Sequence, residues 1–187
     1  MNNRHTTIRT LHDVGAAVWM GGSLMGAVGL NGASQDVADA GDRTRIASSG
    51  WARWAPVSAA AIAAHLAGGL GLLIANRGRA AGQSGVTANT VIKTAVTVAA
   101  VGTTAYSGLL GARIARAGRV PAEGGSEPAQ NTPDDVAATL KQQRLLQWAI
   151  PALTGTMIAM GAQQGEQQRP GQMWGGVARK FSGVLGR

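Results

Sequence analysis

Apolar residues along this chain gather in four long stretches, and the segments between them carry most of the charge. The first stretch has no charged side chain after Asp13 for more than twenty positions. A helix that crosses the hydrocarbon core of a bilayer needs about 20 predominantly apolar residues. The pattern therefore predicts four transmembrane helices, at about 11–31, 55–75, 90–115 and 145–162.

The polar segment 34–54, between the first two stretches, contains acidic and basic side chains that would be costly in hydrocarbon. The spacing of its apolar residues predicts a short helix lying at the membrane interface, built on Val37, Ile46, Trp51 and Trp54. Trp51 and Trp54 would then belong to the aromatic belt that precedes the second span.

The second long polar segment, 116–143, is rich in proline, glycine and acidic residues and predicts a loop. Asp134 and Asp135 follow Pro133, and acidic residues in a first turn favour a helix start because they complement the helix dipole. We expect this helix to continue into the fourth span. Trp148 would then lie at the interface on the same side as the tryptophans of the segment 34–54.

These elements predict an all-α polytopic membrane protein. Residues 1–163 would form a bundle of four transmembrane helices with one interfacial helix, followed by a basic polar tail at 164–187. The tail predicts either an amphipathic helix on the membrane or a disordered segment. Arg4 and Arg9 before the first stretch also resemble the start of a signal peptide, but the stretch is longer than a usual signal core, which favours a retained helix.

Small residues dominate the apolar stretches. Glycine occurs 28 times, phenylalanine and tyrosine once each, and the mean hydropathy is only +0.03. A soluble core needs larger side chains to fill its volume, whereas membrane helices associate through small residues that let backbones approach. The glycines predicted to pack helices together are Gly15, Gly22, Gly26, Gly29, Gly68, Gly69, Gly108 and Gly111.

The net charge is +8 and the isoelectric point about 11.5. Because the charges flank the apolar stretches, we expect them to meet anionic lipid headgroups rather than nucleic acid. Nine basic residues lie on the side of the two termini and eight on the other, a slight preference for cytoplasmic termini. Lys93, near the start of the third span, is expected to extend to the headgroups.

His65 is the foremost candidate for chemistry, because it lies midway along the second span, where an ionisable side chain is expected to face other helices. One interpretation is a haem or copper ligand, or a proton relay. The other, which we favour, is a neutral histidine hydrogen bonded to a neighbouring helix. The favoured interpretation has no catalytic residue, metal or cofactor, and the absence of cysteine excludes disulfides and thiolate sites.

Three further residues belong to the redox interpretation. His12 lies near the start of the first span, which predicts a depth about 10 Å from that of His65 and a place at the interface. Met20 and Met157 fall near the middle of their spans, and a thioether together with an imidazole suits copper(I) or a haem axial pair. The cofactor-binding candidates of this interpretation are therefore His65, His12, Met20 and Met157.

The segment LHDVGAAVWMGG at 11–22 resembles the LHxxGxAxWxGG opening of the first helix in several small bacterial membrane families. CopD-like copper-resistance proteins and related four-span proteins are examples. The resemblance implies a polytopic membrane protein that handles metal or haem, with His12 as the matching histidine. The rest of the chain has no cluster rich in methionine and histidine of the kind that copper handling would use.

The sequence thus predicts an integral protein of the cell membrane that acts through its Gly/Ala-rich helix faces, as an accessory, scaffold or self-associating component. Its partners would be the bilayer, further copies of itself or another membrane protein. The alternative is a haem- or copper-handling redox protein that uses His65.

Overall fold

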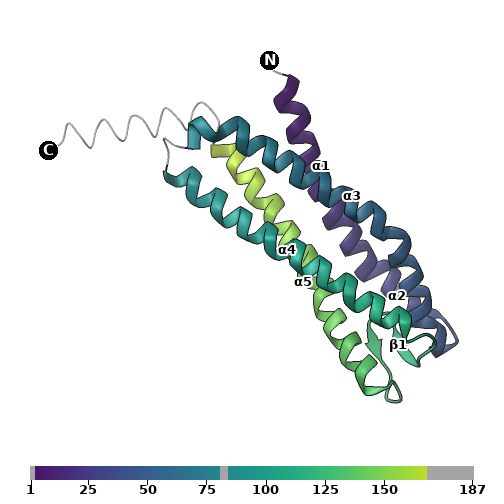
Figure 1. The fold of residues 1–187 in the computed structure, drawn as a ribbon. Helices are drawn as coiled ribbons and strands as arrows, with labels where there is room; N and C mark the ends of the chain where they lie inside the picture. The colour runs from purple at the N-terminus through teal and green to yellow at the C-terminus, as the bar shows by residue number, and fades with distance from the viewer. Residues whose placement is uncertain (1–2, 81–83, 168–187) are drawn as a thin grey trace, which may run out of the picture.

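The computed structural model describes residues 3–80 and 84–167, and these residues are mostly helical. Figure 1 shows long helices lying side by side, with a small hairpin at one end. In chain order the elements are α1 (Asn3–Met25), a π-helical turn (Gly26–Leu30), α2 (Asn31–Ala33), a 3₁₀ turn (Ser34–Asp36), α3 (Ala40–Ala80), α4 (Ser84–Arg116), β1 (Ala122–Gly124), β2 (Glu127–Pro128) and α5 (Asp134–Gln167).

Four helical segments are long and apolar enough to cross a membrane, which confirms the four apolar helices predicted from the sequence. They are Thr6–Asp36, Ala40–Ala75, Asn89–Arg116 and Asp134–Gln163. Many of their large apolar side chains face outward, including Leu70, Val91, Val98 and Leu109, each about 60% exposed or more. The predicted start of the last helix at Asp134 and Asp135 is also confirmed. The basic tail at 164–187, predicted as either an amphipathic helix or a disordered segment, lies largely outside the described residues.

The predicted interfacial helix over 34–54 is wrong, because residues 40–54 form the first third of α3 without interruption. Pro56, at the start of the predicted second span, lies inside α3. At about 1.5 Å per residue, the 41 residues of α3 extend over about 60 Å, twice the thickness of a bilayer core. The charged first third of the helix therefore reaches past the apolar part of the bundle.

Close contact between α1 and α3 depends on glycine. A Cβ atom at Gly15 would lie 2.6 Å from the carbonyl oxygen of Ala61 and 2.6 Å from the amide nitrogen of His65. The rings of Trp54 and Trp51 occupy the space beside Gly22 and Gly26. The two backbones meet directly at Gly15, whereas further along α1 the absent side chains make room for tryptophan rings.

The other predicted packing glycines differ in their surroundings. A Cβ at Gly68 would lie 2.5 Å from the amide nitrogen of His12, and one at Gly69 3.1 Å from the ring of the same residue. At Gly29 the nearest atom is the sulfur of Met25, in the preceding turn. At Gly108 and Gly111 on α4 nothing lies within 4 Å. The contacts between α1 and α3 thus use glycines from both helices, while α4 keeps part of its surface open.

Two apolar clusters hold the helices together. The first lies in the middle of the bundle and consists of Trp19, Ala61, Ala100, Ile150 and Met157, one or more from each long helix. The second lies at the hairpin end and consists of Ile114, Val120, Ala122, Val136 and Leu140. The second cluster joins α4 and α5 through the segment 117–133, which the sequence predicted as a loop. That segment instead contains β1 and β2, paired antiparallel.

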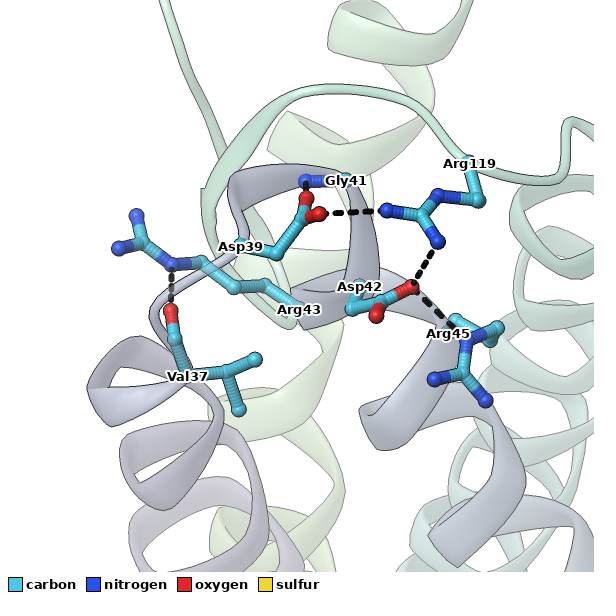
Figure 2. A network of polar contacts seen from close by, with 7 residues as sticks. All are labelled: Val37, Asp39, Gly41, Asp42, Arg43, Arg45 and Arg119. Carbon is cyan, nitrogen blue, oxygen red and sulfur yellow. Dashed lines mark hydrogen bonds and ion pairs between the residues drawn. The ribbon is translucent and has the colours of Figure 1, made fainter.

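An ionic network closes the hairpin end. Arg119, just after α4, forms ion pairs with Asp39 and Asp42 at the start of α3 (Figure 2). Asp42 also pairs with Arg45 at 3.0 Å, and Asp39 accepts a hydrogen bond from the amide of Gly41 at 2.8 Å. This cluster, which we call the Arg119 clasp, ties the end of α4 to the beginning of α3. The start of α1 and the end of α5 lie at the opposite end of the bundle (Figure 1).

Candidate functional site

His12 of α1 and His65 of α3 form a buried pair. Their rings are stacked, with centroids 4.0 Å apart and planes inclined by 20°. The Nδ1 atom of His12 donates to the carbonyl oxygen of His65, and the Nδ1 atom of His65 donates to the carbonyl oxygen of His12, each at 2.9 Å. These carbonyl groups accept only, so each imidazole carries a proton on Nδ1.

The predicted difference in depth between these two histidines, about 10 Å, is wrong. It assumed that α3 starts at its apolar part, but the helix already begins at Ala40. Helices α1 and α3 run antiparallel from a short connection at 37–39, and the two histidines lie at nearly equal distances from it along the chain. The two histidines therefore lie at the same height along the helix pair. Gly15 of α1 and Gly68 of α3 have no side chain, so the helices approach closely enough for the rings to stack.

Lys93 completes the polar cluster. Its Nζ atom lies 3.1 Å from Nε2 of His12, so the side chain bridges α4 to α1 instead of extending to the headgroups as expected. A neutral imidazole that donates from Nδ1 has its lone pair on Nε2, which accepts from the ammonium group. The His12–His65–Lys93 cluster thus joins three helices.

The two candidate methionines, Met20 and Met157, contact residues of α4 and α5. The sulfur of Met157 accepts a hydrogen bond from Thr97 at 3.1 Å and belongs to the central apolar cluster. The end of Met20 lies against Gly155 of α5. Trp19, which precedes Met20 in the chain, meets the ring of His65 edge-on at 6.2 Å and donates to Thr104 at 3.2 Å.

The arrangement fits a haem poorly. Two imidazoles that ligate one haem iron lie on opposite faces of the porphyrin, whereas these two rings stack directly on each other. Among the described residues, no group of three or more His, Cys, Asp or Glu side chains is arranged to hold a metal ion. The contacts that are present join helices to one another.

A second polar site, which sequence analysis missed, lies at the hairpin end. Trp51 donates from Nε1 to Oδ1 of Asn31 at 3.0 Å, and Asn31 donates from Nδ2 to Oε1 of Gln147 at 2.7 Å. Ser126, in the turn between β1 and β2, donates to the same Oε1 at 3.1 Å. The chain of bonds connects α3, α2, the hairpin and α5.

This chain borders a pocket of about 220 Å³ between α2, the hairpin and α5. On one side of the pocket Arg144 pairs with Glu127 at 3.5 Å, and Gln35 donates to Glu127 at 2.9 Å. We call this the amide pocket; its residues are Ala27, Asn31, Gly32, Gln35, Gly125, Ser126, Glu127, Arg144, Gln147 and Trp148.

One signal for the amide pocket was present in the sequence. Asn31 and Gln147 are amides at the ends of apolar stretches, where a buried amide needs a partner. Their partnership depends on the crossing of α2 and α5, which lie more than a hundred residues apart in the chain. Comparison with protein-family models, curated proteins and solved structures finds no match to this chain.

Proposed function

We propose that this chain is a multi-pass integral membrane protein that acts as a scaffold, associating through its helices with further copies of itself or with another membrane protein. The observation that carries the proposal is the surface of α4, the least buried of the four apolar helices. Between residues 91 and 112 its exposed residues other than Tyr106 are apolar or small, and Gly102, Gly108 and Gly111 have open space where a side chain would lie.

The open glycines on α4 contrast with Gly15 and Gly22 of α1, whose neighbours are atoms of α3. A lipid-facing surface gains nothing from glycine, whereas a helix–helix contact in a membrane gains close backbone approach. Exposed Val98 and Leu109 beside these glycines would supply the van der Waals contact.

Membrane insertion is tested first. Carbonate extraction should leave the protein in the membrane pellet, and reporter fusions at both termini should agree, with the cytoplasm as the proposed side. Recovery in the supernatant, or fusions that report opposite sides, would contradict a four-span protein.

Association is tested by replacing Gly108 with Leu, which fills the open space on α4. In detergent and in vesicles, cross-linked dimers or larger assemblies of the wild type should be lost in Gly108→Leu while the melting temperature stays the same. Val91→Leu, a change of size at an exposed apolar position, is the control. A wild type that stays monomeric at every protein-to-lipid ratio and co-purifies with no membrane partner would overturn the scaffold.

The second candidate function is haem or copper handling at His65: two imidazoles share one buried site, although their stacking fits a shared haem iron poorly. A visible spectrum and metal analysis of the protein purified from membranes test it. A Soret band or stoichiometric copper that disappears in His65→Gln would establish this alternative in place of the scaffold.

A further inference from the structure

The orientation of the amides beside the amide pocket follows from a tryptophan. An indole nitrogen only donates, so Trp51 requires Oδ1 of Asn31 to be the acceptor. Nδ2 of Asn31 is then the donor, and the atom it meets on Gln147 must be an oxygen. Ser126 donates to this oxygen as well, so Oε1 of Gln147 is used twice.

The remaining end of Gln147 is an NH₂ group with two donors. Gln147 is only 8% exposed and lines the pocket, and among the described residues its Nε2 atom has no hydrogen-bond partner. Among the described residues, the fully buried side-chain atoms without a partner are Oγ1 of Thr44 and Oε1 of Gln143, so Nε2 of Gln147 is open to the pocket. A ligand in the pocket that accepts hydrogen bonds would therefore meet two unused donors.

The two charges of the pocket define the rest of the ligand. Arg144 has five donor N–H groups, and at 3.5 Å its contact with Glu127 is long for a hydrogen bond, which leaves its donors for an oxyanion. The carboxylate of Glu127 in turn offers acceptor positions beyond the one used by Gln35. With one positive and one negative side chain, the pocket suits a zwitterion better than a simple anion.

The surroundings indicate where such a ligand comes from. Leu145 and Trp148 lie on α5 next to Arg144, 73% and 51% exposed, and form an apolar surface that begins at the pocket. Tryptophan at the end of an apolar helix is typical of the level of the lipid headgroups. A headgroup in the pocket would let its acyl chains lie against Leu145 and Trp148.

We propose that the amide pocket binds an aminoalkyl phosphate, with the phosphate at Gln147 and Arg144 and the amine at Glu127. Its source is the headgroup of phosphatidylethanolamine. The assignment of a lipid source rests on the proposed membrane insertion, whereas the headgroup chemistry does not.

Native mass spectrometry of the full chain in detergent tests the proposal with three probes: phosphatidylethanolamine, phosphatidylglycerol, and free phosphoethanolamine. The wild type should retain phosphatidylethanolamine in preference to phosphatidylglycerol, and free phosphoethanolamine should compete for the site. Binding of the free compound without binding of the lipid would overturn the lipid source. Carbonate extraction measures membrane insertion separately, so the two proposals fail by different results.

Variants separate the pocket from general lipid binding. Gln147→Glu keeps an oxygen for Asn31 and Ser126 but replaces the NH₂ group with a second oxygen, so it should fold and bind phosphatidylethanolamine at least about tenfold more weakly. Arg144→Gln removes an exposed charge and should weaken binding to a similar extent. Lys141→Gln, one turn earlier on α5, is the control and should bind as the wild type does.

Glu127→Gln tests the amine. It should lose the preference for phosphatidylethanolamine over phosphatidylglycerol while still binding phospholipid, because the phosphate donors remain. Equal retention of both lipids by the wild type, Gln147→Glu and Arg144→Gln would overturn the proposal, since it would show unspecific lipid contact. An unchanged preference in Glu127→Gln would overturn the placement of the amine.

Discussion

His12 and His65 each satisfy a main-chain carbonyl of the other residue's helix. This use of the side chains explains why two ionisable residues are accommodated inside an apolar bundle, since every donor that faces the other helix is bonded. It also gives the pair a structural role that does not depend on a bound metal.

The first prediction concerns the hydrogen bond that Nδ1 of His65 donates to the carbonyl oxygen of His12. In His65→Asn the amide NH₂ group replaces Nδ1 as the donor to His12, so the loss of stability should be small. His65→Leu removes this hydrogen bond, while the carbonyl of His12 keeps its partner within α1, and should cost about 0.5–1.5 kcal/mol more. Thermal or denaturant unfolding in detergent measures both. Equal destabilisation by Asn and Leu would show that the imidazole ring itself, through stacking or a ligand, is what the site requires.

At this scale the sequence identified His65 and favoured a bonded histidine, but it did not identify the partner. Which side chain meets His65 depends on the register between α1 and α3. Lys93 illustrates the same limit: its position near a helix end predicted contact with headgroups, yet the ring of His12 lies within hydrogen-bond distance of its Nζ atom.

Helix α1 is held against α3 at distances that only glycine allows. At Gly15 the neighbouring atoms are backbone atoms of α3, which cannot rotate away as a side chain can. A Cβ at Gly108 would meet no atom of another described segment within 4 Å. The same residue type therefore has opposite roles on the two helices.

The second prediction compares the stability of alanine variants at Gly15 and Gly108. Gly15→Ala forces α1 and α3 apart and should destabilise the protein by about 1–3 kcal/mol, as overpacking does. Gly108→Ala is the matched control: alanine is the better helix former by about 0.8–1 kcal/mol, so the monomer should be equally stable or slightly more stable. Unfolding in detergent by circular dichroism checks both. Destabilisation of the same size at the two positions would contradict the distinction between them.

The boundaries of α3 in the structure differ from those that hydropathy predicts. Polar composition suggested a break between 34–54 and the second span, but α3 continues through it, because its charged first third packs beside the end of α1 and the hairpin. Arg43 donates from Nη1 to the carbonyl oxygen of Ala122 at 3.2 Å, a contact that exists only once β1 is in place.

The described part of the molecule consists mainly of four long apolar helices, and at its charged end the Arg119 clasp joins the end of α4 to the beginning of α3. The clasp joins residues that lie about eighty positions apart. Apart from Asp42 its side chains are exposed, so its contribution to stability is expected to be modest and sensitive to salt.

The third prediction therefore concerns salt. Arg119→Gln should lower the melting temperature slightly at low ionic strength, and the difference from the wild type should disappear at about 1 M salt. Arg116→Gln, in the last turn of α4, removes a positive charge with no ion pair in the described part of the chain and serves as the control. A loss that persists at high salt would mean that Arg119 stabilises the hairpin end by packing rather than by charge.

The fourth prediction uses the absence of cysteine from the sequence. Glu123→Cys in β1 and Val98→Cys in the middle of α4 are both exposed in the structure. In sealed vesicles a membrane-impermeant maleimide should label Glu123→Cys from one side only, and Val98→Cys should stay unlabelled until detergent and denaturant are added. Labelling of Val98→Cys in intact vesicles would show that this face of α4 meets water.

The number of apolar helices and the start of the last one at Asp134 could be predicted from the sequence, because helix formation and hydropathy depend on near neighbours in the chain. Which residues meet was set by the tertiary structure. His12 with His65, Asn31 with Gln147, and Arg119 with Asp39 all depend on how far each helix extends and how the helices cross. Those quantities are set by contacts between distant segments, and no local pattern of residues encodes them.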